Sequence, residues 1–280
     1  MQRTVAAGCA DATHGTPPTE ARPTQLSVTQ VESLIRDPYA IYARHILALR
    51  PLDPIDSDPG AADRGTIIHG VLDEFITAHP KNLPPNAEQA LLDIGHQHFE
   101  SHMSRPGIRA FWWPRFQRIA AWFIDNERRR RDAGWRTVAT EVDGVRIFDG
   151  LQTPFTLKAR ADRIDARPNV GLAIIDYKTG KCAVGDWVGE RPKEPQLLLY
   201  LLASGQAPTA LAFAQVRPGD CAYVGLGESG SVPGVRTDVA RVVGEKMAAQ
   251  VEGSGALDNH RALRWDAYCL RCLDEWFTFP

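Results

Sequence analysis

Two stretches decide how this chain folds: Leu157-Lys158-Ala159-Arg160-Ala161-Asp162-Arg163-Ile164-Asp165 and Ile174-Ile175-Asp176-Tyr177-Lys178-Thr179-Gly180. Both have the residue types of β-strands, and the segment between them, Arg167-Pro168-Asn169-Val170-Gly171, has the composition of a turn. The sequence therefore predicts an antiparallel hairpin. If the turn is centred on Asn169, then Asp162 lies directly opposite Asp176.

Two facing aspartates indicate a cation site. Directly opposed residues have Cβ atoms roughly 4.5–5.5 Å apart, and like charges placed there are destabilising. A divalent cation between them reverses that effect. Lys178 lies two residues beyond Asp176 and therefore on the same face of the strand. Two carboxylates and a lysine on one face suit metal-assisted hydrolysis. The alternative is a surface hairpin with ordinary ion pairs, and a slip of one residue in register would rearrange these side chains.

Helical patterns surround the hairpin. Ser27-Val28-Thr29-Gln30 is a capping-box pattern that opens one helix, and Asp37-Pro38 opens another over 39–49. Apolar residues repeat with helical period over 61–78. Further helices are expected near 86–103, 107–133, after Pro195, and near 235–251 and 265–276, with strands at 136–142, 145–148, 209–216 and 221–226. These elements predict one mixed α/β domain with a covered sheet.

Composition narrows the class of protein. The chain has 280 residues, of which 44% are hydrophobic, and its 32 basic and 34 acidic residues give a net charge of −2. It contains no apolar run of the ~18 residues that a membrane span needs and no signal-peptide pattern, and its five scattered cysteines fit a reducing cytoplasm. Residues 1–25, rich in Ala, Thr and Pro, are expected to be a disordered linker before a domain over 26–280. No G-x-x-x-x-G-K-[ST] loop is present, so no ATP site is expected.

Two further patterns contribute polar groups. His69 ends Gly65-Thr66-Ile67-Ile68-His69 at the edge of an apolar helical stripe, where a histidine on its own is more often a packed core residue. Gln196 and Tyr200, four residues apart, share one helix face and both offer hydrogen bonds. On their own they would be the polar margin of a buried helix.

Taken in order, the histidine motif, Asp162 before Arg-Ile-Asp, Asp-Tyr-Lys-Thr-Gly and Gln-x-x-x-Tyr resemble the RecB-like branch of the PD-(D/E)xK nuclease superfamily. Ser27-Val28-Thr29 and the run from Asp37 to Arg44 further resemble the entry helix of the C-terminal nuclease domain of AddB. The resemblance runs from about residue 26 to the C-terminus. It implies a restriction-endonuclease-like α/β core, a mixed central sheet flanked by helices, with an N-terminal helical section.

The resemblance also implies roles for individual residues. Asp162 and Asp176 would bind catalytic Mg²⁺, with His69 and the Tyr177 carbonyl as further ligands. Lys178 would orient the attacking water and stabilise negative charge in the transition state. Gln196 and Tyr200 would position DNA and the lysine. Because a histidine is a softer ligand than Mg²⁺ prefers, we expect Mn²⁺ to substitute.

The function implied is that of a metal-dependent DNA exonuclease. The domain would belong to an AddAB-type helicase–nuclease of double-strand break repair and recombination, paired with an AddA-like subunit. One alternative is a non-catalytic module on the same fold that binds DNA or docks the partner, and another is a phage-type exonuclease. No iron–sulfur cluster is expected, because the entry position holds Asp37 and only Cys269 and Cys272 lie near the C-terminus.

Two weaker candidates remain. Glu141 lies just before the predicted hairpin, where related nucleases often have an acidic residue; a solvated glutamate at a strand end is the favoured interpretation. Arg128, Arg129, Arg130 and Arg131 end an aromatic-striped helix, where cations suit the helix C-terminus. A solvated face is the favoured interpretation of this run, and a phosphate-binding track is the alternative.

Overall fold

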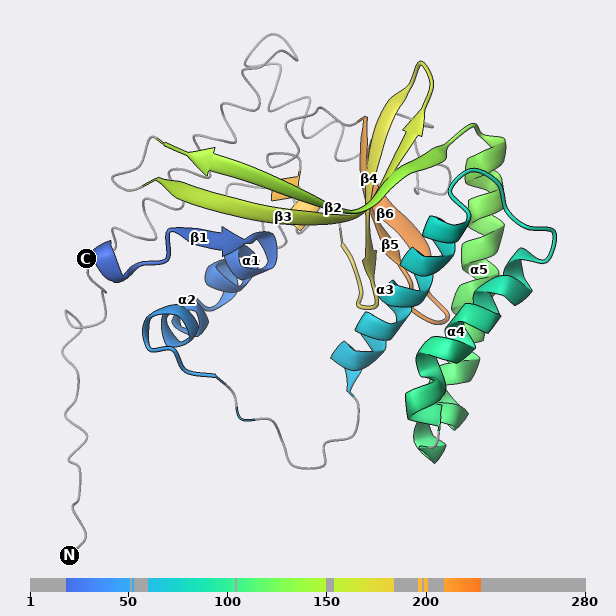
Figure 1. Cartoon of the computed structure of the whole chain (residues 1–280), viewed down its shortest axis with the longest axis horizontal. Helices are drawn as coiled ribbons and strands as arrows, with labels where there is room; N and C mark the ends of the chain where they lie inside the picture. Colours follow the sequence, from blue (N-terminus) through green and yellow to red (C-terminus); the bar gives the residue numbers. More distant parts are fainter. Residues whose placement is uncertain are drawn as a thin grey trace, which may run out of the picture.

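The structure is a computed structural model that describes residues 19–50, 52, 60–103, 105–149, 154–183, 196–197, 199–200 and 209–227. Its elements in chain order (Figure 1) are η2 (Thr19–Ala21), β1 (Gln25–Ser27), α1 (Val28–Arg36), α2 (Pro38–Ile41), η3 (Tyr42–Ile46), α3 (Ala61–Ala78), α4 (Ala87–Met103), η4 (Ile108–Trp112), α5 (Trp113–Asp132), β2 (Arg136–Phe148), β3 (Phe155–Arg167), β4 (Gly171–Lys178), β5 (Ala210–Gln215) and β6 (Ala222–Gly227). The helices predicted near 235–251 and 265–276, with Cys269 and Cys272, lie outside the described residues, as do residues 1–18.

The described strands form one mixed sheet of six strands. Along the path β1-β3-β4-β5-β6, the pairs β1–β3 and β4–β5 are parallel and the others antiparallel, while β2 runs antiparallel along the other edge of β3. Figure 1 shows β2 and β3 as a long two-stranded arm that extends away from β4–β6. The predicted fold, a mixed sheet with flanking helices and a helical N-terminal part, is confirmed.

The β3–β4 hairpin has the predicted register. Arg163 pairs with Ile175 and Asp165 with Ala173, so the same register continued by one residue places Asp162 opposite Asp176. Asn169 lies at the turn with a φ of 63°, a left-handed conformation that asparagine tolerates better than most residues. The turn residues therefore fix which side chains of the two strands meet.

Helices α3, α4 and α5 form a bundle beside β4–β6 (Figure 1). The predicted stripe of α3 is confirmed, since Ile68, Val71, Leu72, Phe75 and Ile76 are all buried in it. Helices α4 and α5 come unusually close at Gly95, where an added Cβ would lie 2.2 Å from the Phe116 ring. None of the helices in the described part of the chain is both long and apolar enough to cross a membrane.

The N-terminal section packs on the other end of the sheet. Ser27 caps α1 through the predicted capping box, in which its hydroxyl accepts from the Gln30 N–H and the Gln30 side chain accepts from the Ser27 N–H. Asp37 caps α2 with Pro38 at its first position, also as predicted. The apolar face of α1 joins a buried cluster with Leu157 and Phe213.

Several elements differ from the sequence-based expectations, including the short helix η2 within the segment expected to be a linker. Strand β1 begins at Gln25, inside the segment expected to be a linker, and pairs with β3. The helix expected over 39–49 consists of α2 and a π-helical turn that ends at Ile46. The strands expected at 136–142 and 145–148 form one strand, β2, because the glycine between them, Gly144, stays paired with β3.

Candidate active site

The hairpin brings the predicted carboxylates together. Asp162 on β3 accepts a hydrogen bond through Oδ2 from the Tyr177 backbone N–H at 2.8 Å. His69, halfway along α3, places Nδ1 3.4 Å from the same Oδ2 atom. Its ring also meets the Tyr177 ring edge-on, with centroids 5.8 Å apart. His69 and Asp162 thus meet beside Tyr177, the residue between Asp176 and Lys178 on β4.

Lys178 and Asp176 are held by the helical segment that follows Pro195. Gln196 donates through Nε2 to Asp176 Oδ1 at 2.9 Å and accepts from the Lys178 ammonium through Oε1. Tyr200 donates to the same Asp176 oxygen at 3.2 Å, and the four described residues here are helical, as predicted. This arrangement fixes the lysine beside the carboxylate, with Lys178 Nζ 3.3 Å from Asp176 Oδ2.

The charges at this site are poorly compensated. Burial, followed by the charge of Asp176, raises the pKa of Asp162 above its usual range. Burial also raises the pKa of Asp176, although Lys178 and His69 oppose that shift. For His69, burial lowers the pKa, against the charge of Asp176. Two carboxylates that both resist ionisation indicate a site that requires additional positive charge.

Asp176 has one oxygen that is incompletely paired. Its Oδ2 atom is buried without a hydrogen-bond partner, although the Lys178 ammonium lies 3.3 Å away, and a buried oxygen without a hydrogen bond costs free energy. Carboxylate oxygens are the ligands that Mg²⁺ and Mn²⁺ prefer. Within the described residues, no three His, Cys, Asp or Glu side chains already form a group able to hold an ion. The chemistry of Asp162, Asp176 and His69 suits a hard divalent cation, although these side chains do not form a complete coordination shell in this structure.

A second charged cluster lies behind the hairpin, and sequence reasoning missed it. Arg163 donates to both oxygens of Glu127 on α5, at 2.7 and 3.1 Å, and to both oxygens of Asp165, at 2.7 and 2.9 Å. Arg130 binds Asp165 Oδ2 at 2.5 Å and Thr137 binds its Oδ1 at 2.9 Å. The available signal was the run Asp162-Arg163-Ile164-Asp165, which puts charges on both faces of one strand.

The predicted arginine run divides into two parts. Arg128 and Arg129 are exposed, as expected of a solvated face, and Arg129 pairs with Asp125. Arg130 is fully buried against Asp165, and Arg131 is largely buried and donates to the His79 carbonyl at 2.6 Å. Both the solvated face and the phosphate track are therefore wrong for these two residues, because the last turn of α5 faces the sheet.

Glu141 does not lie at a strand end. It is part of β2 and has a left-handed φ of 50°. In the β2–β3 register its position is opposite Asp162, and its charge contributes to raising the pKa of that carboxyl. Its Oε2 atom is 2.5 Å from Arg160 Nε, so the glutamate is already paired.

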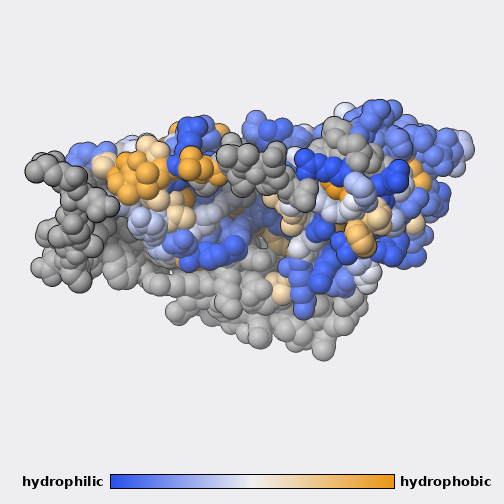
Figure 2. All heavy atoms as spheres, turned by 90° about the horizontal axis from the view of Figure 1, so that it is seen from below, coloured by the Kyte–Doolittle hydropathy of each residue, from blue (hydrophilic) through white to orange (hydrophobic). Residues whose placement is uncertain are grey.

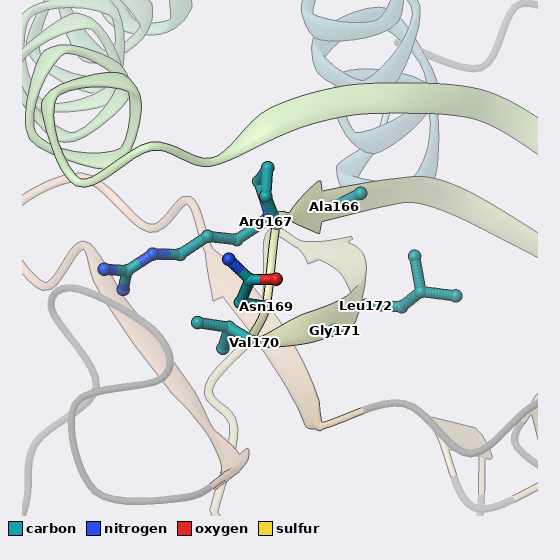
Figure 3. A pocket seen from close by; sticks show the side chains of 7 residues that line it. Ala166, Arg167, Asn169, Val170, Gly171 and Leu172 are labelled. Carbon is teal, nitrogen blue, oxygen red and sulfur yellow. The ribbon is translucent and has the colours of Figure 1, made fainter.

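A pocket in the described structure lies at the turn of the hairpin rather than at the carboxylates. It is lined by the residues from Ala166 to Leu172, and Figure 3 shows the Arg167 and Leu172 side chains leading away from the turn in different directions. Ala166 is four residues from Asp162, or roughly 13 Å along an extended strand. The pocket and the charged site are thus separate features.

Comparison with known proteins places these residues in a family context. An uncharacterized protein of Rickettsia bellii is 32% identical over 182 residues, which is 64% of this chain and 21% of that protein. An ATP-dependent helicase/deoxyribonuclease subunit of Lacticaseibacillus paracasei is 24% identical over 67% of this chain and 18% of its own length. The chain therefore spans about a fifth of the length of the curated relatives it matches.

Two further comparisons concern structure and family. The solved structure of SSO0001 aligns with 67% of this chain and 88% of its own at 16% identity, with a TM-score of 0.26, which is too low to relate the two folds. The family model of the PD-(D/E)XK nuclease superfamily matches residues 25–280. That match covers the hairpin, its charged residues and the helices around it, and the chain belongs to the PD-(D/E)XK nuclease superfamily.

Proposed function

We propose that this chain is a metal-dependent deoxyribonuclease that hydrolyses phosphodiester bonds. The observation that carries the proposal is the convergence of Asp176 with the Asp162–His69 pair: the buried Oδ2 atom of Asp176 has the Lys178 ammonium 3.3 Å away but no hydrogen-bond partner. Such an arrangement is unfavourable for a protein that only folds. It becomes favourable when a divalent cation binds to the carboxylates.

Each residue has a role that follows from its contacts. Asp162, Asp176 and His69 would hold the ion, and the resemblance described above implies the Tyr177 carbonyl as a further ligand. When bound, Mg²⁺ or Mn²⁺ polarises the scissile phosphate and lowers the pKa of a water. The Lys178 ammonium donates to Gln196 Oε1 and lies 3.3 Å from Asp176 Oδ2. From there it orients the attacking water and offsets negative charge on the phosphate.

The larger assembly belongs to the same proposal. The similarity to helicase/deoxyribonuclease subunits supports a role as the exonuclease part of an AddAB-type enzyme in double-strand break repair and recombination, with an AddA-like partner. The five scattered cysteines support action in a reducing cytoplasm. Co-purification with an AddA-like helicase would separate this role from that of a phage-type exonuclease.

Cleavage of end-labelled linear DNA tests the chemistry. We expect cleavage in Mg²⁺ or Mn²⁺ and none in EDTA. Asp176→Ala and Lys178→Ala should each reduce the rate by more than about 100-fold, since loss of even one group that stabilises transition-state charge has effects of that order. Cleavage that persists in EDTA would contradict the metal-dependent mechanism.

Lys158 provides a matched control, because it is an exposed lysine on β3 outside the site. Lys158→Ala should cleave at the wild-type rate. DNA binding by the wild type without cleavage in any metal would support the non-catalytic module instead. Retention of DNA binding by Asp176→Ala, with cleavage lost, would separate the catalytic role of the carboxylate from a role in binding.

A further inference from the structure

The turn that joins α4 to α5 carries positive charge that the proposed chemistry does not use. The segment from Arg105 to Ile124 contains four arginines and no acidic residue, in a protein whose net charge is −2. The nearest acids along the chain are Glu100 and Asp125. A local concentration of positive charge on a nearly neutral protein indicates a surface for an anionic partner.

Aromatic side chains are interleaved with these arginines. Phe111 is 63% exposed at the end of the π-helical turn η4. Its neighbour Trp112 is half-buried and packs against the helical core on one side. Arg109 and Arg115 are exposed on either side of this pair. An exposed aromatic ring offers a face on which a base can stack, and Phe111 is such a ring within the arginine-rich segment.

Helix α3 connects this surface to the candidate active site. The Arg64 guanidinium lies over the Trp112 ring, 5.9 Å from its centroid. The next residue, Gly65, lies against the end of β4, where an added Cβ would be 3.4 Å from Thr179 Oγ1. Thr179 follows Lys178 directly, and His69 is one helical turn beyond Gly65. The start of α3 therefore contacts Trp112 through Arg64 and lies against the end of β4, next to Lys178, through Gly65.

Arg64, Arg109, Phe111, Trp112 and Arg115 are named here the arginine–aromatic patch. Figure 2 views the molecule from below, the side on which α3 and α5 begin in Figure 1, and hydrophilic side chains predominate on the part that holds α4 and α5. Scattered apolar residues interrupt that surface. The patch thus combines cations with an exposed ring, Phe111, as single-strand-binding surfaces do.

We propose that the arginine–aromatic patch binds single-stranded DNA beside the carboxylate site. The arginines contact the phosphates, and the exposed Phe111 ring stacks on an unpaired base, which a duplex keeps within its own stack. This inference rests on the proposed nuclease function, and it adds that a single strand passes over the first turns of α3. An apolar protein partner would explain the exposed Phe111 ring, whereas the excess of arginines over acidic residues along this segment favours a polyanion.

Fluorescence anisotropy of labelled oligothymidine and of a matched duplex, in EDTA to prevent cleavage, tests the proposal on the full chain. Phe111→Ala should weaken single-strand binding by roughly 5- to 100-fold, which corresponds to the loss of one stacked base. The double variant Arg109→Gln/Arg115→Gln should weaken binding and reduce the salt dependence by about 0.7 for each phosphate that is no longer bound. Arg36→Gln on α1, whose side chain is 70% exposed, is the control and should bind as the wild type does.

The outcomes separate this inference from the proposed function. Wild-type affinity in both patch variants would overturn it, and so would an equal loss on single strands and duplex for Phe111→Ala. Loss of binding to a helicase partner, with DNA affinity unchanged, would also overturn it and favour a protein-docking surface. If the patch variants lose single-strand affinity while the wild type cleaves nothing, the patch is supported and the nuclease proposal fails. Circular dichroism of each variant confirms that it is folded.

Discussion

The two faces of the β3–β4 hairpin carry acidic residues in opposite electrostatic states. On one face, burial raises the pKa of Asp162 and of Asp176, and one oxygen of Asp176 has no hydrogen-bond partner. On the other face, the charges of Arg163 and Arg130 outweigh burial and lower the pKa of Asp165 well below its usual range. Asp162 and Arg163 are adjacent in sequence, so a single strand supplies both environments.

This difference shows how paired and unpaired charges are distributed over the two faces of the hairpin. The network around Arg163 satisfies both carboxylates that it touches, and it ties β3 to α5 through Glu127. It can therefore hold the hairpin in one register while the opposite face stays undercompensated. A buried charge is tolerated when an opposite charge pairs with it, whereas a cation site needs carboxylates whose negative charge is not already neutralised. One face thus carries paired charges, and the other carries the undercompensated carboxylates of the proposed cation site.

Removing Arg163 should produce the largest effect on folding. Arg163→Met keeps a long apolar side chain but leaves Glu127 buried without its bidentate partner and Asp165 with Arg130 as its one arginine partner. Breaking a buried ion pair in this way typically costs about 3–5 kcal/mol. The free energy of unfolding, measured by urea denaturation in EDTA, should fall by that amount.

Lys158→Met is the matched control on the same strand. Lys158 is exposed, and its loss should change the free energy of unfolding by less than about 0.5 kcal/mol. Asp162→Asn, on the undercompensated face, should also have a small effect, because it removes a charge that burial disfavours. A large loss in Asp162→Asn and none in Arg163→Met would reverse the assignment of the two faces.

Replacing Gln196, which contacts Asp176 and Lys178, should have an intermediate effect on the rate of cleavage. Gln196→Ala removes the group that joins Lys178 to Asp176. Residues that orient metal-site groups without binding the metal typically change activity by about 10- to 100-fold when mutated. We expect a decrease of that size in the rate of DNA cleavage in saturating Mg²⁺, with DNA affinity preserved.

A second glutamine, Gln89, provides a matched control for Gln196→Ala. Gln89 on α4 is exposed and donates to Asp93 one turn further along the same helix. Gln89→Ala should therefore cleave at the wild-type rate. If Gln196→Ala instead weakened DNA binding in proportion to cleavage, its role would be contact with the substrate and not the positioning of Lys178.

Much of the site face followed from local sequence rules. The turn at Asn169 fixed the hairpin register, and the strand period of two then placed Asp176 and Lys178 on one face. Helical spacing likewise placed Gln196 and Tyr200 together. Each of these inferences depends on neighbours within one element or across one tight turn, where the geometry allows few alternatives.

The network on the other face could not be derived in the same way. Whether Arg130 and Arg131 face solvent or the sheet depends on how α5 docks, which is a contact between distant segments. Their charge favoured a solvated face, and the burial of the pair against Asp165 and Glu127 overrode it. A run of like charges predicts exposed side chains only when no opposite charge is buried nearby. Here two carboxylates, Asp165 and Glu127, lie in the core.

The different electrostatic environments of the two faces also predict that acid lowers the free energy of unfolding. Per pH unit, this decrease should be smaller than the decrease caused by removing Arg163. Asp165 has a lowered pKa in the folded state, because Arg163, Arg130 and then the hydrogen bonds they donate outweigh its burial. Its contribution to stability is therefore fully present above the ordinary carboxyl pKa of about 3.9, and it is lost as the pH falls further toward the folded-state value. For one proton the slope is at most about 1.4 kcal/mol per pH unit.

Asp165→Asn isolates that contribution. The amide cannot ionise, so the free energy of unfolding of the variant should fall less steeply below about pH 4 than that of the wild type. The groups that face this carboxyl are Arg163 on β3, Arg130 and Glu127 on α5, and Thr137 on β2. A slope below pH 4 as steep as that of the wild type would contradict the assignment of this acid sensitivity to Asp165. Above pH 5 the two slopes should be equal, because the Asp165 carboxyl takes up no proton there.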